Sequence, residues 1–229
     1  EAITLLNEAA DTGDTATLYL LHTFYRQGVG VNMDERRAER LLQRAADQGS
    51  AAAQAELGRL AMLGTPGIES RRTAASWFRR AAEQGHTAAQ VELAWILFNG
   101  SAGSRDLAGA ADWFGAAARA GDHRSQLQFA RMLLEGLGRP IDEEAAARWY
   151  RLAADAGEAD AQFVLAWMHF QGRGASQDPA AALNWLRRAA ATGHVLACFS
   201  LGSMLEEGAA GTADPAAARD WYQRAASAG

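Results

Sequence analysis

Seven glycines recur along this chain at a constant spacing of 36 residues, and each closes an Ala-Ala-x-x-Gly sequence that resembles a helix end. They are Gly13, Gly49, Gly85, Gly121, Gly157, Gly193 and Gly229. A period of this length holds one supersecondary unit, which cannot bury its apolar face alone and has to stack on its neighbours. The sequence therefore predicts a solenoid, a linear array of repeats that share a continuous core.

The domain organisation follows from the same period. We expect one domain over residues 1–229, made of a half repeat at 1–13 and six complete repeats at 14–49, 50–85, 86–121, 122–157, 158–193 and 194–229. The chain begins without Met and stops on a repeat glycine, whereas solenoids close with atypical capping repeats, so we expect a piece excised from a longer protein. Apolar side chains at the two open ends predict end-to-end self-association, namely Leu5 and Leu6 at one end and Trp221 and Tyr222 at the other.

Composition excludes several classes of function. A net charge of −5 argues against a nucleic-acid partner, because phosphate recognition needs a basic surface. All 22 basic residues are arginine, and without lysine there is no Walker phosphate loop and no Schiff-base chemistry. Cys198 is the single cysteine and cannot form an intrachain disulfide. No apolar run approaches the roughly 18 residues of a membrane span, so this chain is not expected to insert into a membrane.

Within each repeat, aligned columns predict a first helix. A large apolar residue lies eight positions after each repeat glycine and is followed by a small residue, which would let a second helix approach closely. The large column is Leu21, Leu57, Leu93, Phe129, Leu165 and Leu201, and the small column is His22, Gly58, Ala94, Ala130, Ala166 and Gly202. Fifteen positions after the repeat glycine a further glycine predicts a left-handed helix cap, at Gly28, Gly64, Gly100, Gly136, Gly172 and Gly208.

A second helix is predicted after a short loop. Its N-cap column holds Asp34, Ser70, Asp106, Asp142, Asp178 and Asp214, with proline after the last two. We interpret these side chains as caps rather than metal ligands. Further along, alanines and the tryptophans Trp77, Trp113, Trp149, Trp185 and Trp221 share one helix face and are expected to pack.

These columns together resemble the Sel1-like repeat family, a relative of the tetratricopeptide repeats. Repeat one contains Gly28-Val29-Gly30-Val31 and Asp34, while Trp149-Tyr150 with Ala153-Ala154 matches the second-helix signature. The resemblance covers the whole chain, and the 36-residue period with its Gly-x-Gly loop separates it from the shorter tetratricopeptide unit. Local departures are His22 in the small column and Pro66 and Ala102 in the loops.

The resemblance implies an all-α, right-handed α/α superhelix of helix-turn-helix repeats with the first helices on the concave face. It also implies a non-catalytic scaffold or adaptor that binds a protein or peptide, in bacteria often in envelope, secretion, signalling or exopolysaccharide machinery. By resemblance alone, the bacterial periplasm or envelope is favoured over the cytoplasm. A cysteine-rich branch of the family carries peptidoglycan-related activities, but this chain lacks its cysteine pairs.

The candidate binding residues lie on a stripe of the first helices that the packing columns do not use. This stripe varies between repeats, and Trp and Arg are enriched among binding hot spots. The principal candidates are Arg59, Trp95, Arg131 and Trp167, with Glu56, Glu92, Asn99, Gln128, Glu135 and Gln171 beside them. At roughly 10 Å per repeat, Trp95 and Trp167 would lie about 20 Å apart, which suits an extended peptide or, alternatively, a polysaccharide. Packing of both tryptophans against neighbouring helices is the alternative interpretation.

No catalytic or cofactor-binding constellation is evident, so we predict no enzyme and no cofactor. Recurring carboxylates are one repeat apart rather than paired across a cleft, and a cell-wall-related hydrolase is kept only as an alternative. His86, His123 and His194 are expected in inter-helix turns, while His22 and His169 fall in packing columns. Cys198 is expected to be a half-buried thiol.

Overall fold

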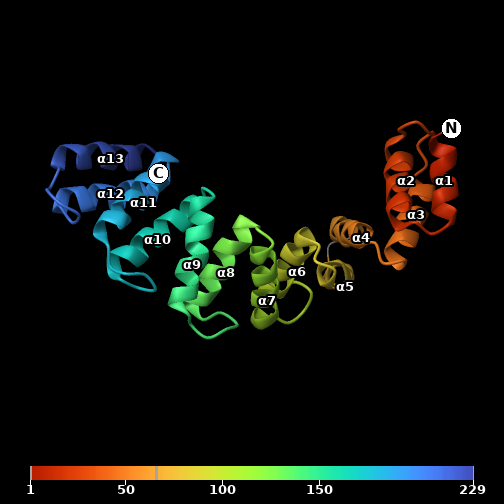
Figure 1. Ribbon diagram of the computed structural model, residues 1–229, viewed down its shortest axis with the longest axis horizontal. Coiled ribbons are helices and arrows are strands. Elements are labelled where there is room, and N and C mark those ends of the chain that lie inside the picture. The colour runs from red at the N-terminus through yellow and green to blue at the C-terminus, as the bar shows by residue number, and fades with distance from the viewer. Residues whose placement is uncertain (1, 65–66, 229) are drawn as a thin grey trace. The chain divides into compact units, whose positions relative to one another are not determined.

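The computed structural model describes residues 2–64 and 67–228, with side chains described from Leu5 onward, and consists of helices joined by short loops (Figure 1). Over those residues it contains thirteen α-helices and no strand. The helices form two compact units, Glu1–Ala116 and Ala117–Gly229, which are described separately below. The predicted all-α class and the helix-turn-helix repeats are therefore confirmed.

The first unit begins with α1 and continues as helix pairs. Its helices are α1 (Ala2–Asp11), α2 (Thr15–Gln27), α3 (Glu35–Asp47), α4 (Ala51–Leu63), α5 (Ile68–Glu83), α6 (Thr87–Asn99) and α7 (Leu107–Arg119), the last of which crosses into the second unit. Within this unit α2 packs on α3, α4 packs on α5, and each pair contacts the next one. The first helix of each repeat is therefore α2, α4 or α6.

The second unit repeats the same arrangement. Its helices are α8 (His123–Glu135), α9 (Glu143–Asp155), α10 (Ala159–Gln171), α11 (Pro179–Ala191), α12 (Val195–Glu207) and α13 (Pro215–Ala228). The pairs α8–α9, α10–α11 and α12–α13 are each in close contact. Among the helices described in both units, none is long and apolar enough to span a membrane.

Five of the six second helices begin at the predicted aspartate. Each carboxylate accepts a hydrogen bond from the backbone N–H three residues further on, at 2.8–3.0 Å, for Asp34, Asp106, Asp142, Asp178 and Asp214. These bonds satisfy a backbone donor that the helix itself leaves without a partner. The prediction for Ser70 is wrong, because α5 starts earlier, at Ile68, and its N-cap is Gly67.

The glycine that ends the first helix is left-handed in five repeats. Gly28, Gly100, Gly136, Gly172 and Gly208 have φ between 66° and 71°, a region that a Cβ makes unfavourable. The sixth prediction, Gly64, is wrong: its φ is −69° and ψ −159°, so the chain leaves α4 in an extended direction. This different exit accompanies the earlier start of α5; Pro66, predicted to alter the same loop, lies outside the described residues.

The packing columns form the core, with three corrections. The large column of the first helices is buried at Leu21, Leu93, Phe129, Leu165 and Leu201, as predicted, whereas Leu57 is half-buried. The second-helix tryptophans are half-buried, except for the buried Trp185. The residue that follows each tryptophan lies deeper in the core. These following residues are the buried Phe78, Phe114, Tyr150 and Leu186 and the half-buried Tyr222. Cys198, expected to be half-buried, is only 2% exposed.

A buried glutamine links each of the second to fifth repeats to the repeat before it. The side-chain Nε2 of Gln54, Gln90, Gln126 and Gln162 donates to the carbonyl oxygen of Ala46, Ala82, Ala118 and Ala154 respectively, at 2.9–3.2 Å. Each carbonyl lies at the C-terminal end of a second helix, where carbonyls lack helical partners. The Cys198 thiol takes the same place and points at Ala190 O, 3.6 Å away.

Of the apolar residues expected to be exposed near the ends, Leu5 is exposed. Leu6 packs against a buried cluster that includes Leu18 and Leu42, and Trp221 is half-buried. The half-buried Tyr222 packs over Gly202 and donates its hydroxyl to Glu206 Oε2, at 2.8 Å. End-to-end self-association stays a prediction, and of the four side chains on which it was based only Leu5 is exposed.

Candidate functional groove

The first unit contains a groove of about 400 Å³ between α4 and α6, bordered by α2. Its lining residues come from three successive first helices and from the second helix α5. They are Tyr19, Ala52, Ala55, Glu56, Arg59, Met62, Leu63, Phe78, His86, Ala88, Ala89 and Glu92. The repeat geometry explains this composition, because stacking places the variable faces of α2, α4 and α6 side by side.

Much of the lining and rim of the groove is apolar. Four alanines leave room between the helices, and Phe78 from α5 lines the groove from the core side, 3% exposed. Leu63 and Met62 at the end of α4 are 68% and 40% exposed. Exposed large apolar side chains beside a concave surface are typical of binding sites for other molecules.

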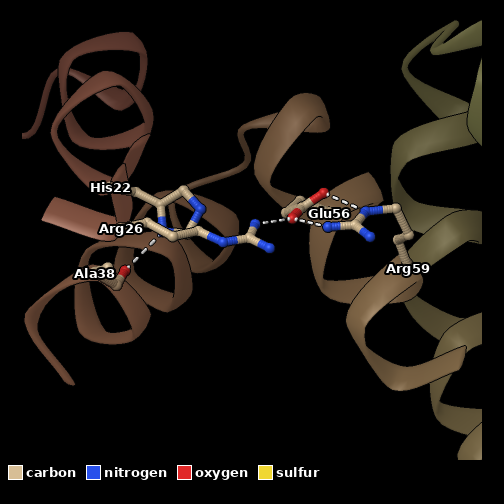
Figure 2. Close-up of polar contacts among 5 residues, drawn as sticks. All are labelled: His22, Arg26, Ala38, Glu56 and Arg59. Atoms are coloured by element: carbon tan, nitrogen blue, oxygen red, sulfur yellow. Dashed lines mark hydrogen bonds and ion pairs between the residues drawn. The ribbon is translucent and has the colours of Figure 1, made fainter. Parts of the chain in front are cut away.

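One carboxylate in the groove is held by two arginines from neighbouring repeats. Figure 2 shows Arg26 of α2 reaching Glu56 of α4, with Nη1 2.7 Å from Oε1, while Arg59 approaches the same carboxylate from one turn further along α4. The Arg59 Nε donates to Oε2 at 2.8 Å and its Nη2 lies 2.5 Å from Oε1. These bonds, that of Arg59 first, lower the pKa of the Glu56 carboxyl below its ordinary value. Glu56 therefore stays ionised and joins two repeats at the border of the groove.

Tyr19 forms the α2 side of the groove. It is half-buried, and burial together with the nearby Glu56 carboxylate raises the pKa of its phenol. Its ring stacks on His22, with centroids 5.8 Å apart. Tyr19 therefore stays neutral and presents a partly apolar wall.

The two histidines in packing columns are satisfied core residues, as predicted. His22 Nδ1 donates to the carbonyl oxygen of Ala38 at 2.9 Å (Figure 2). His169 Nδ1 lies 3.2 Å from Ser176 O, and its Nε2 lies 3.1 Å from Arg151 Nη2. Since the carbonyl accepts and the guanidinium donates, the His169 ring carries its proton on Nδ1.

The other three histidines lie at helix N-termini. His86 and His194 are the N-caps of α6 and α12, and each Nδ1 accepts a backbone N–H, at 3.2 and 3.1 Å. His123 is the first residue of α8 rather than a turn residue. Within residues 2–64 and 67–228, no three His, Cys, Asp or Glu side chains come together in a way that could hold a metal ion.

The groove brings together three of the predicted binding residues, Glu56, Arg59 and Glu92. Two more predicted residues, Trp95 and Asn99, lie on α6 but do not line the groove. The half-buried Trp95 ring packs edge-on against Phe98 and Phe114, with centroids 5.7 and 5.0 Å away. These contacts fit the alternative interpretation, in which Trp95 packs against a neighbouring helix.

The remaining predicted residues belong to the second unit. Gln128, Arg131 and Glu135 lie on α8, and Trp167 and Gln171 lie on α10. Arg131 Nε lies 2.8 Å from Glu135 Oε1, a pair that raises the pKa of the arginine. The half-buried Trp167 packs edge-on against Phe170 of its own helix, with centroids 5.4 Å apart. Whether these residues bind a partner stays a prediction.

The sequence prediction did not include several groove residues. Ala52, Ala55, Met62, Leu63, Phe78 and His86 all line the groove. A signal was present in the columns: Ala55 is the smallest residue in a column otherwise filled by Tyr19, Val91, Leu127, Phe163 and Phe199. A column with one truncated side chain predicts a gap at that repeat.

Stacked helix pairs, linked between repeats by buried glutamines and lining a groove in the first unit, define an α-solenoid scaffold. The kind of solenoid repeat is shown by the Sel1 repeat family model, which matches residues 23–50, 51–86, 87–122, 123–158, 159–194 and 195–229. The chain therefore belongs to the Sel1 repeat family, as the column resemblance predicted.

Solved structures agree with this assignment. A protective antigen of uropathogenic Escherichia coli strains, which displays an SLR fold, is 33% identical with a TM-score of 0.82, over 99% of this chain and 48% of that protein. This chain thus spans about half the length of that relative. A Sel1 repeat protein from Oxalobacter formigenes is 28% identical with a TM-score of 0.65, over 93% of this chain and 85% of that one. A search of curated proteins found no match.

Proposed function

We propose that this chain is a non-catalytic scaffold that binds an extended peptide or protein segment in the groove of its first unit. Sel1 repeats are a scaffold fold whose members typically bind proteins, and this chain has that fold. The observation that carries the proposal is the groove itself, where an exposed apolar rim lies beside ionised side chains on the variable face of α2, α4 and α6. The envelope, secretion or exopolysaccharide setting implied by the resemblance belongs to the proposal as well.

The dimensions favour a peptide over a small metabolite. Packed helices lie about 8–10 Å apart, so if each repeat advances the stack by roughly 10 Å, the three first helices extend over roughly 20 Å. An extended chain advances about 3.3 Å per residue, and roughly six residues would cover that distance. A groove lined by residues of α2, α4 and α6 suits such a segment.

The chemistry of the groove also favours a peptide. Burial of Leu63, now largely exposed, would contribute at most about 1.5–3 kcal/mol to binding. The Glu56 and Arg59 side chains offer an acceptor and donors for a polar backbone or side chain. A glycan would need open tryptophan faces, yet Trp95 is half-buried against Phe114 and lies outside the groove lining.

Site-specific photo-cross-linking tests the proposal. A photoreactive amino acid replaces Leu63 at the groove rim in one protein and Leu152, exposed on the second helix α9, in a control protein. Both are irradiated in a lysate of the source organism, and cross-linked peptides are sequenced by mass spectrometry. We expect position 63 to capture a defined peptide segment that position 152 does not. The same products from both positions, or none from position 63, would contradict a binding groove.

A further inference from the structure

Two histidines occupy the same place in different repeats. His86 and His194 are 108 residues apart, which is three repeats, and both cap the helix that follows them. In each, Nδ1 accepts a backbone N–H, so the ring proton lies on Nε2 and is available for donation. The two sites can therefore be compared position by position.

In the second unit the surroundings of this histidine are filled. His194 Nε2 lies 3.0 Å from Asp160 Oδ1, and the imidazole stacks on the ring of Phe163, with centroids 5.0 Å apart and an interplanar angle of 26°. The protein thus supplies both a hydrogen-bond acceptor and an aromatic face to His194.

In the first unit both partners are missing. The positions that correspond to Asp160 and Phe163 are Ala52 and Ala55, and both alanines line the groove together with His86. His86 Nε2 forms no hydrogen bond with any residue that the structure describes. Space that a phenyl ring fills beside His194 is therefore open beside His86.

We propose that the groove receives an aromatic side chain of the partner segment, stacked on His86 in the manner of Phe163 on His194. This inference rests on the proposed function and names the chemistry of its ligand. The His86 Nε2–H donates to a carbonyl oxygen of the bound backbone, taking the part that Asp160 plays in the second unit. Phe78 and Met62 supply apolar contacts from the groove lining.

The charges of the groove select what flanks the aromatic residue. Glu56 is already neutralised by Arg26 and Arg59. Glu92 is exposed, lines the groove, and has no ion pair with any described residue. An arginine or lysine beside the aromatic residue would complement Glu92, whereas an acidic residue there would be repelled.

Titration with three short peptides tests the selectivity. The probes are N-acetylated, C-amidated Ala-Arg-Phe-Arg-Ala, Ala-Arg-Ala-Arg-Ala and Ala-Glu-Phe-Glu-Ala, followed by amide NMR shifts in the ¹⁵N-labelled chain. We expect the first peptide to shift amides of α4 and α6 around Ala55 and Ala89, saturably and with roughly tenfold higher affinity than the other two. Equal affinities, shifts elsewhere, or no binding by the first peptide would overturn the inference.

Filling the gap provides the matched variants. Ala55→Phe restores the ring that Phe163 provides in the second unit and should abolish binding of the phenylalanine peptide. The control, Leu127→Phe, introduces the same residue in the same column outside the groove and should bind normally. His86→Ser keeps a capping side chain, as Ser50 does for α4, but removes the imidazole and should weaken binding about tenfold.

Circular dichroism and melting temperature confirm that each variant is folded. Unchanged binding in folded Ala55→Phe or His86→Ser would overturn the aromatic pocket. The proposed function would still stand if position 63 cross-links a segment, so failure of the two ideas can be told apart.

Discussion

The ring of Phe78 occupies the place that a Cβ on Gly58 would need. An added Cβ at Gly58 would lie 2.7 Å from two carbons of that ring, and Phe78 is only 3% exposed. Because Gly58 has no side chain, α5 packs close to α4, and the Phe78 ring reaches the lining of the groove.

Gly58→Ala is therefore expected to destabilise the protein. Alanine gains about 1 kcal/mol of helix propensity over glycine, whereas overpacking a buried site costs about 1–3 kcal/mol, so the net loss should be about 1 kcal/mol. Phe78→Leu in the same chain should recover most of it, because Ala166 and Leu186 occupy these columns in another repeat. Urea unfolding of the single and double variants measures the effect; a fully stable Gly58→Ala would show that the ring moves freely.

The Glu56 ion cluster should make stability depend on pH. The pKa of Glu56 lies below its ordinary value of 4.5 in the folded protein, so the cluster stabilises the fold above that value. The contribution is lost as the pH falls through the folded-state pKa. Because both arginines are about half exposed, Glu56→Gln should cost only about 0.5–1 kcal/mol at neutral pH.

The difference in unfolding free energy between Glu56→Gln and the parent should shrink as the pH is lowered from about 6 toward about 3. Glu39→Gln, an exposed position on α3, is the control and should show no such trend. A Glu56→Gln deficit that is constant with pH would mean that packing, rather than charge, is lost.

The buried glutamines that link the repeats should differ in their contribution. Gln54 uses both ends of its amide, since Oε1 accepts from Gln84 Nε2 at 2.8 Å while Nε2 donates to Ala46 O. Gln162 Oε1 is buried and has no partner among the described residues. Removing an unpaired buried acceptor relieves a desolvation cost, whereas removing a paired one leaves partners unsatisfied.

We therefore expect Gln54→Leu to cost about 1–2 kcal/mol and Gln162→Leu to cost less. Denaturant unfolding of the two variants provides the comparison. A larger loss for Gln162→Leu would indicate that an ordered water completes its hydrogen bonding.

Trp95→Ala is expected to act mainly on stability. The ring packs edge-on against Phe114 of α7, so truncation should cost about 2–4 kcal/mol and lower the melting temperature. Arg59→Ala removes a half-exposed side chain and should cost at most about 1 kcal/mol. If Trp95→Ala melts at the parental temperature, the ring is free to serve as a contact for a ligand.

Much of the fold was predictable because a repeat presents each structural requirement six times. The aspartate N-caps and the small-residue column were recognisable on that basis, and Asp34 and Gly58 act as the columns indicated. The predictions for Ser70 as an N-cap and Gly64 as a left-handed cap are both wrong, since one altered loop changes both the end of α4 and the start of α5. Aligning the repeats cannot reveal such a change when the residues at these positions, a glycine and a serine, still suit the usual caps.

The groove was less predictable, because it arises from what one repeat lacks. Glu56, Arg59 and Glu92 of the variable stripe line the groove, but its open space comes from Ala52 and Ala55, which carry no chemical signal of their own. The bond from Arg26 to Glu56 joins residues 30 apart and depends on the stacking of α2 on α4. Trp95 packs edge-on against Phe114 and lies outside the groove lining, so its role in binding stays a prediction.

The central claim, that the groove of the first unit binds a partner segment, is tested most directly by calorimetric titration of the segment captured at position 63. The parent is compared with an Arg59→Ala, Leu63→Ala variant and with Arg40→Ala, an exposed arginine on α3 away from the groove. We predict that the groove variant binds about tenfold or more weakly while Arg40→Ala binds like the parent. Equal affinity for all three proteins would contradict the groove as the binding site.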